Sequence, residues 1–147
     1  MEVSVGIDIN RPSEDVFEYI ADMSNNPQWQ NGQERCEWTS EPPLRLGSTY
    51  DQEARFLGKA IHSSFEVVEY EPGSRIRIRS TAGTMPIDVT RTVSPIDEGS
   101  CHVEALVKGD TPTIFRPLGP LMKTMVGRNV RKDYEQLKQL LENGSGS

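Results

Sequence analysis

The sequence predicts an α+β domain in which a long C-terminal helix covers one face of an antiparallel sheet. Short stretches of alternating apolar and polar residues recur up to residue 109, and Pro- and Gly-rich turns separate them. Such short connections favour antiparallel pairing. From Arg116 to Glu142 the apolar residues instead recur at three- to five-residue spacing, which is typical of an amphipathic helix. The sheet is the only partner surface large enough for that helix.

The first thirty residues predict a strand and then short helical structure. Four apolar residues alternate with polar or small ones at the start: Val3, Val5, Ile7 and Ile9. Ser13 can cap a helix whose first turn carries Glu14 and Asp15, which suit the positive end of the helix dipole. The stretch 22–32 contains Asn-Asn-Pro and predicts a loop or a broken short helix, and we expect Trp29 to plug the end of the core.

Six more strands follow, each closed by a turn signal. They are Gln33–Ser40, Ser48–Leu57, Ala60–Tyr70, Arg75–Thr81, Met85–Ser94 and Ser100–Lys108. The strand Gln33–Ser40 could form an exposed edge and pair across a homodimer, so monomer and homodimer both stay open. We expect residues 1–142 to form a single domain and residues 143–147, Asn-Gly-Ser-Gly-Ser, to be a flexible linker remnant.

Composition narrows the classes of function. The chain has 147 residues and a net charge of -6, which disfavours binding to nucleic acid or anionic membranes. No apolar run approaches the roughly 18 residues of a membrane span, and the N-terminus lacks a signal-peptide pattern, so we expect a cytoplasmic protein. The two histidines and two cysteines lack metal-ligand spacing, and no Gly-rich phosphate loop is present; neither metal nor cofactor is expected.

Several motifs resemble one known family in order and spacing. They are the run from Ile9 to Phe17, Asn26-Pro27-Gln28-Trp29, Gly47-Ser48-Thr49-Tyr50, Phe56-Leu57-Gly58-Lys59, the run from Val67 to Gly73, and the ending Leu137 to Glu142. The chain resembles the START-like helix-grip (SRPBCC) superfamily, in its polyketide cyclase/dehydrase and lipid-transport branch. The resemblance implies a strongly curved antiparallel sheet of about seven strands wrapped around the C-terminal helix. It also implies two short helices after the first strand and an internal cavity.

Strand alternation indicates which residues would face that cavity. The candidate ligand-binding residues are Trp38, Tyr50, Gln52, Phe56, Phe65, Val67, Ile78, Ile87, Val89, Leu118, Met122 and Met125. Leu121 lies on the same part of the helix. An ordinary packed core would show the same pattern, so the cavity itself depends on the resemblance. In the run Arg75–Arg79 the isoleucines face inward and the arginines outward, with Glu66 opposite Arg79.

The last strand has two possible registers. Burial of apolar side chains favours an inward face made of Cys101, Val103, Ala105 and Val107. A bulge would shift the register by one residue and place Glu104 opposite Arg91 inside the cavity. Arg91, His102 and Glu104 would then form a polar cluster able to orient a ligand or to catalyse a reaction. Without the bulge, Arg91 is expected at the sheet rim, in contact with solvent.

The favoured function is binding of a small hydrophobic ligand, such as a lipid, a polyketide or a sterol-like compound, for transport, storage or sensing. The alternative is a polyketide cyclase or dehydratase that uses polar residues inside the same cavity, with His102, Glu104 and Arg91 as candidates. The sequence offers no clear acid–base pair, which favours binding. A third possibility is a protein-interaction domain, which would have a filled core and a large exposed apolar patch.

Overall fold

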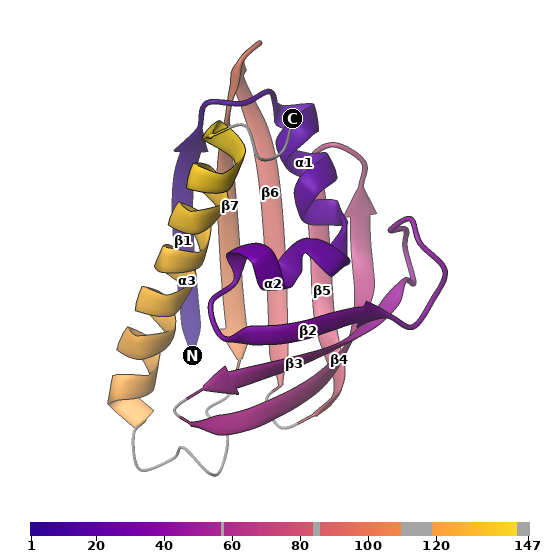
Figure 1. Cartoon of the computed structure of the whole chain (residues 1–147), viewed down its shortest axis with the longest axis vertical. Helices are drawn as coiled ribbons and strands as arrows, with labels where there is room; N and C mark the ends of the chain where they lie inside the picture. The colour runs from indigo at the N-terminus through magenta and orange to yellow at the C-terminus, as the bar shows by residue number, and fades with distance from the viewer. Residues whose placement is uncertain (57, 84–85, 110–118, 144–147) are drawn as a thin grey trace.

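The computed structural model describes residues 1–56, 58–83, 86–109 and 119–143. A curled sheet forms one layer, and the helices lie on its concave side (Figure 1). The elements in chain order are β1 (Glu2–Ile9), α1 (Ser13–Ala21), the 3-10 turn η1 (Met23–Asn25), α2 (Asn26–Trp29), β2 (Gln33–Trp38), β3 (Thr49–Phe56), β4 (Lys59–Glu71), β5 (Arg75–Gly83), β6 (Ile87–Asp97), β7 (Ser100–Gly109) and α3 (Gly119–Glu142).

The seven strands form one antiparallel sheet in the order β1-β7-β6-β5-β4-β3-β2. Strands β2 to β7 therefore follow one another in sequence and in space, while β1 crosses over to pair with β7. Strands β2 and β3 run steeply across the direction of β6 and β7, which shows how strongly the sheet curls (Figure 1). The predicted α+β architecture, a curved seven-stranded sheet with a long C-terminal helix and short helices after the first strand, is confirmed.

Helix α3 packs mainly against the edge strand β1. Gly127 lies in this interface, where an added Cβ would make an ordinary contact with Val3 Cγ1 at 3.8 Å. This glycine does not interrupt the helix. The predicted helix began at Arg116, but residues 116–118 lie outside the described residues, as does the predicted tail beyond Asn143.

The predicted cap of the first helix was wrong. Ser13 begins α1 but makes no capping hydrogen bond, and the residue at the N-cap position is Pro12.

The register of the last two strands decides which residues face inward. Arg91 pairs with Ala105 and Val93 with Val103, so the predicted apolar face of β7 lies inside. The alternative bulge does not occur there; the irregularity in this pair lies between Pro95 and Asp97, near the turn. A shift by one residue would have buried Glu104 and exposed apolar side chains, which is costly.

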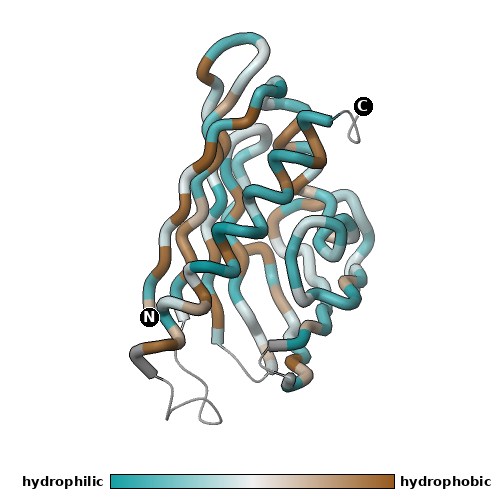
Figure 2. Tube along the Cα trace, turned by 60° about the vertical axis from the view of Figure 1, so that its left-hand side comes forward, coloured by the Kyte–Doolittle hydropathy of each residue, from teal (hydrophilic) through white to brown (hydrophobic). Residues whose placement is uncertain are grey.

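The core lies between the curled sheet and the helices. Trp29, Tyr50, Ile76 and Leu137 are among its fully buried side chains. Hydrophobic and hydrophilic positions alternate along the strands, as the sequence pattern predicts (Figure 2). Among the helices that the structure describes, none has the length and apolar character needed to cross a membrane.

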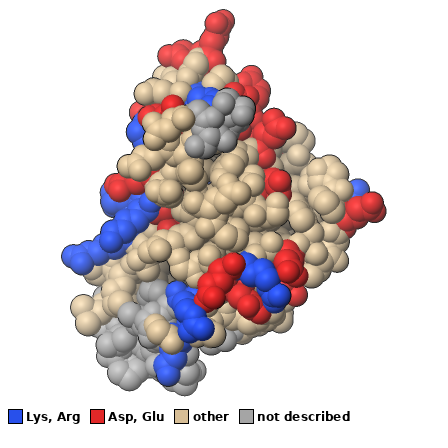
Figure 3. Space-filling model, viewed as in Figure 1, with Lys and Arg blue, Asp and Glu red and all other residues tan. Residues whose placement is uncertain are grey.

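The outer face of the sheet carries ion pairs. Glu66 lies opposite Arg79, as predicted, but Arg79 pairs with Asp88 instead, at 3.5 Å. Arg77 also binds Asp88, at 2.8 Å. Acidic and basic side chains gather over β2 and β3 as well (Figure 3). Strand β2 is an edge of the sheet, as expected.

Candidate ligand-binding cavity

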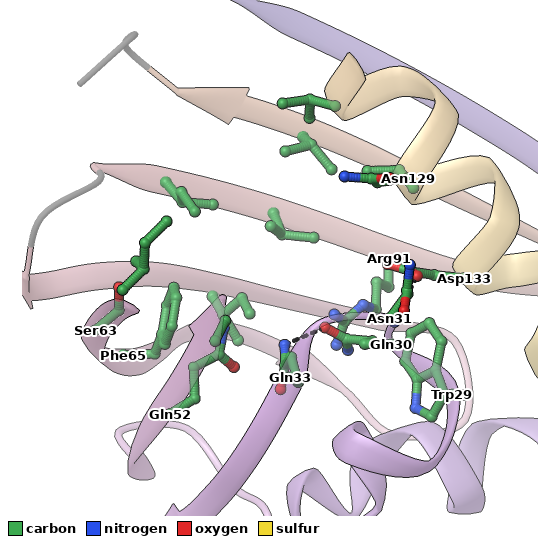
Figure 4. Close-up of a pocket in the computed structure, with 18 of the residues that line it drawn as sticks. Trp29, Gln30, Asn31, Gln33, Gln52, Ser63, Phe65, Arg91, Asn129 and Asp133 are labelled. Atoms are coloured by element: carbon green, nitrogen blue, oxygen red, sulfur yellow. Dashed lines mark hydrogen bonds between the residues drawn. The ribbon is translucent and has the colours of Figure 1, made fainter. Parts of the chain in front are cut away.

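A cavity of about 200 Å³ lies between α3 and the concave face of the sheet. The connection between α2 and β2 lies at one end of it (Figure 4). Six of the predicted ligand-binding residues line it: Tyr50, Gln52, Phe65, Ile78, Ile87 and Val89. Four of these six are apolar, and from α3 Val126 and Val130 add apolar surface on the opposite wall.

The other predicted residues lie elsewhere. Val67 and Met122 are fully buried but do not line the cavity; Met122 packs with Ile61 in a small separate cluster. Met125 is partly buried and does not line it either. Trp38 borders a groove beside α1 and stacks edge-on against Tyr50, with ring centroids 6.4 Å apart. Leu118 and the side chain of Phe56 lie outside the described residues, whereas Leu121 is exposed to solvent.

Arg91 provides a buried positive charge in the cavity, whereas Arg55, which also lines it, is exposed and pairs with Glu34. Arg91 points inward from β6 and is only 6% exposed, so the expectation that it reaches solvent at the rim was wrong. Its Nε donates to Tyr134 Oη at 3.0 Å, and its Cζ lies 5.2 Å from the ring centroid of Trp29. Its Nη1 is buried without a hydrogen-bond partner among the described residues.

Asp133 is the acidic group at the same end of the cavity. It precedes Tyr134 on α3, and its Oδ1 accepts a hydrogen bond from the Asn31 backbone N–H at 2.7 Å. Burial raises the pKa of Asp133 to about 7, although the Asn31 N–H and the Arg91 charge oppose that change. Asp133 and Arg91 line the same cavity (Figure 4). At neutral pH this carboxyl group is therefore partly protonated and can either accept or donate a proton.

Two tyrosines add neutral hydroxyl groups. Burial raises the pKa of both Tyr50 and Tyr134, so each keeps its proton at neutral pH. The Tyr50 hydroxyl is buried and has no hydrogen-bond partner among the described residues. Its ring stacks on Phe65, with centroids 5.2 Å apart. The cavity thus presents apolar walls and a polar end with hydrogen-bonding capacity that the described residues leave unused.

Two glutamines close the polar end toward β2. Gln33 Nε2 donates to Gln30 Oε1, as the dashed line in Figure 4 shows. Gln30 Nε2 and Gln33 Oε1 are buried without partners among the described residues. Polar groups left in this state are uncommon inside proteins, and they often indicate a water or a ligand at that place.

The alternative cluster of Arg91, His102 and Glu104, which a bulge would have formed, is absent from the described residues. His102 and Glu104 lie on the outer face of β7 because the register keeps Val103 and Ala105 inside. There the two ring nitrogens of His102 lie 2.6 Å from Asp8 and 3.1 Å from Glu104. These carboxylates raise the pKa of His102. Neither residue can contact a molecule in the cavity.

Sequence reasoning missed the polar residues on α3. Asn129 and Asp133 line the cavity and are spaced four residues apart, on the helix face that also carries Val126 and Val130. Polar residues that interrupt an apolar stripe are a usable signal for such a site. Trp29 is 1% exposed and lines the cavity, where it packs edge-on against Tyr134; the expected role as a plug was incomplete.

The family of the chain follows from comparison with known proteins. Residues 1–142 match the family model described as polyketide cyclase / dehydrase and lipid transport, so the chain belongs to that family. Its fold is the START-like helix-grip fold that the resemblance implied. No curated protein gives a significant match.

Three solved structures illustrate the shared fold. A protein from Thermus thermophilus is 19% identical with a TM-score of 0.83, over 98% of this chain and 99% of its own. A START superfamily protein from Mycobacterium smegmatis is 15% identical with a TM-score of 0.81, over 97% of each chain. An aromatase/cyclase from a Streptomyces species is 12% identical with a TM-score of 0.78, over 97% of this chain and 94% of its own. These similarities show the fold alone.

Proposed function

We propose that this protein binds a small, mainly apolar molecule in the cavity between the sheet and α3. The observation that carries the proposal is the cavity of about 200 Å³, with apolar residues on both walls and a few polar groups at one end. Ligand sites in proteins typically combine such walls with a small number of placed polar groups. The description of the family, which includes lipid transport, supports a carrier, a store or a sensor.

The volume favours a compact ligand. A cavity of about 150 Å³ in another protein accepts benzene. A cavity of about 200 Å³ therefore suits a molecule of one or two rings better than a sterol or a lipid with two acyl chains. Among the ligand classes suggested by the sequence, a small aromatic fragment of the polyketide type fits best.

Filling the cavity tests the proposal. Val89 lines the cavity, whereas Thr90 lies next to it in β6 with its side chain on the outer face. We expect Val89→Phe to weaken ligand binding at least tenfold, and Thr90→Phe to leave it unchanged. Native mass spectrometry followed by denaturing extraction would identify a co-purified molecule, and calorimetry would measure its affinity for the two variants. Equal affinities for both variants would place the ligand outside this cavity.

The second candidate is an enzyme of the cyclase or dehydratase type, and Asp133 is the residue that favours it. A carboxyl group with a pKa of about 7 is well suited to remove a proton from carbon at neutral pH. Arg91 could then stabilise the enolate oxygen that forms. We expect the protein to accelerate deuterium exchange at the acidic carbon of a small 1,3-diketone, followed by NMR. Asp133→Asn should slow the exchange at least tenfold, whereas Glu135→Gln on the exposed face of α3 should not.

The protein-interaction alternative has less support. Three large apolar side chains of the described residues are exposed, namely Leu46, Ile96 and Leu121. They lie in the β2–β3 loop, near the end of β6 and near the start of α3, which are far apart in Figure 1, so they do not form one patch. A cytoplasmic location, the absence of nucleic-acid binding and a monomeric or dimeric state stay predictions.

A further inference from the structure

Arg91 carries a buried charge that the described residues leave without a close anion. None of the ion pairs among these residues includes Arg91. Its contacts are a phenol oxygen, at Tyr134, and an aromatic ring, at Trp29. A charge held in a protein interior without a counter-ion is strongly destabilising. The arrangement is therefore incomplete until an anion neutralises the guanidinium.

The polar end of the cavity is rich in hydrogen-bond donors. Arg91 Nη1 is buried and unpartnered among the described residues, and so is the Tyr50 hydroxyl. Tyr134 Oη accepts the proton of Arg91 Nε, which leaves its own proton free for another acceptor. All three residues line the same cavity. Gln33 Oε1 is also unpartnered there, but the donors at Arg91 and the two tyrosines outnumber it and favour a ligand group that accepts several hydrogen bonds.

Asp133 does not supply the missing anion, because no ion pair joins it to Arg91 among the described residues. Its Oδ1 instead accepts the Asn31 backbone N–H. Burial favours the protonated, neutral form of this side chain despite the attraction of Arg91. A second anion at Arg91 would favour protonation of Asp133 further, since two carboxylates cannot both stay ionised at close range.

We propose that the ligand is a small organic acid whose anionic oxygens, those of a carboxylate in the first place, bind at Arg91, with its apolar body against Phe65, Ile78 and Val89. This inference rests on the proposed function, because it specifies the chemical class of the ligand of the same cavity. A guanidinium can donate two parallel hydrogen bonds to a carboxylate, which would fix the orientation of the ligand. The cavity volume limits the body of the acid to about one or two rings.

Matched pairs of acids and alcohols test this class. The probes are benzoate with benzyl alcohol, cinnamate with cinnamyl alcohol, and 2-naphthoate with 2-naphthylmethanol, each measured by calorimetry at neutral pH. For the pair that fits the cavity best, we expect the carboxylate to bind at least tenfold more tightly than the alcohol. Arg91→Met should abolish that preference, whereas Arg131→Met, on the exposed face of α3, should preserve it.

The outcomes separate the two proposals. If the alcohols bind as tightly as the acids, or if Arg91→Met keeps the preference, the ligand class is wrong and the cavity-binding proposal stands. If neither member of any pair binds, both proposals fail. A thermal melt of each variant checks folding. Should Arg91→Met fail to fold, Arg91→Lys provides the test, because a retained charge should preserve the preference for acids at reduced strength.

Discussion

Two charged residues, Arg91 and Asp133, lie among apolar side chains at the cavity. Arg91 occupies the middle of an inward-facing row of β6, between Val89 and Val93. An apolar residue there would extend the core, and the arginine instead brings a guanidinium to the cavity. Burial likewise disfavours the ionised form of Asp133, which lines the same cavity from α3.

Asp133 should make the protein less stable as the pH rises. Its folded-state pKa of about 7 lies above its ordinary value of 3.8. Between about pH 4 and about pH 7 the unfolded chain therefore loses this proton while the folded chain retains it, and stability falls through that window. A shift of one pKa unit corresponds to about 1.36 kcal/mol when the group is fully shielded from solvent. Because Asp133 is only half-buried, solvent screens part of this effect, and we expect Asp133 to account for a loss of about 2 kcal/mol.

Asp133→Asn should remove this share of the pH dependence. The asparagine keeps an oxygen that can accept the Asn31 N–H but cannot ionise. We expect urea denaturation to show the variant exceeding the parent in stability at pH 8, and this difference to become small as the pH falls to about 4. His102 acts in the same direction, because its raised pKa gives stability below about 6.5 that is lost at higher pH. Identical differences between parent and variant at both pH values would contradict the prediction.

At the level of elements, the C-terminal end of α3 is fixed to the start of the chain. Arg11 Nη1 donates to the Leu141 carbonyl at 2.8 Å, and Lys138 Nζ donates to the Asp8 carbonyl at 2.7 Å. The Glu142 carboxylate accepts the Asn10 backbone N–H at 2.8 Å. Cations near the last turn of a helix are favourable because the helix dipole is negative there. These contacts hold α3 in place beside β1, and hence position Asp133 and Tyr134 at the cavity.

We expect Arg11→Ala to lower the free energy of unfolding by about 1 to 2 kcal/mol. The substitution leaves the Leu141 carbonyl without a charged donor and removes the favourable dipole interaction. Arg35→Ala is the control, because Arg35 lies on the exposed edge strand and its ion pairs with Glu37 and Glu53 are solvated. Chemical denaturation of both variants compares them. If Arg35→Ala lowers the free energy of unfolding as much as Arg11→Ala does, the contact at the helix end contributes no more stability than a solvated ion pair.

For the molecule as a whole, the exposed edge of the sheet determines whether two copies can associate by strand pairing. Strand β2 is short, and the charged residues Glu34, Arg35 and Glu37 lie along it (Figure 3). Charged side chains and short length are common means of preventing edge-to-edge pairing. The other edge, β1, lies against α3. These features favour the monomer over the dimer through Gln33–Ser40.

Removal of the edge charges should cause self-association. We expect the double variant Arg35→Val and Glu37→Val to form dimers or larger species at protein concentrations where the parent stays monomeric. Analytical ultracentrifugation measures this directly. The double variant Arg131→Val and Glu135→Val, on the exposed face of α3, provides an equally apolar control and should remain monomeric. A parent protein that already dimerises through β2 would overturn this interpretation.

The outline of the fold could be predicted from local patterns. Alternation in β4, β5 and β6 correctly placed Phe65, Ile78 and Val89 inside, because side-chain direction in a strand has a strict period of two. Short turns fixed the order of β2 to β7, since antiparallel neighbours need few connecting residues. The curvature and the pairing of β1 with β7 did not follow from these patterns, and they came from the family resemblance or from the structure.

Spacing between near neighbours was enough to predict the class of the fold, the strands, the terminal helix and the apolar face of most strands. The chemistry of the cavity depends instead on how distant elements pack together. Tertiary packing brought Arg91 together with Asp133 and Tyr134 at one cavity, whereas apolar burial already favoured the register that puts His102 and Glu104 outside. Arg91 and Tyr134 are 43 positions apart in sequence. The packing of the helix against the sheet sets the distance between them.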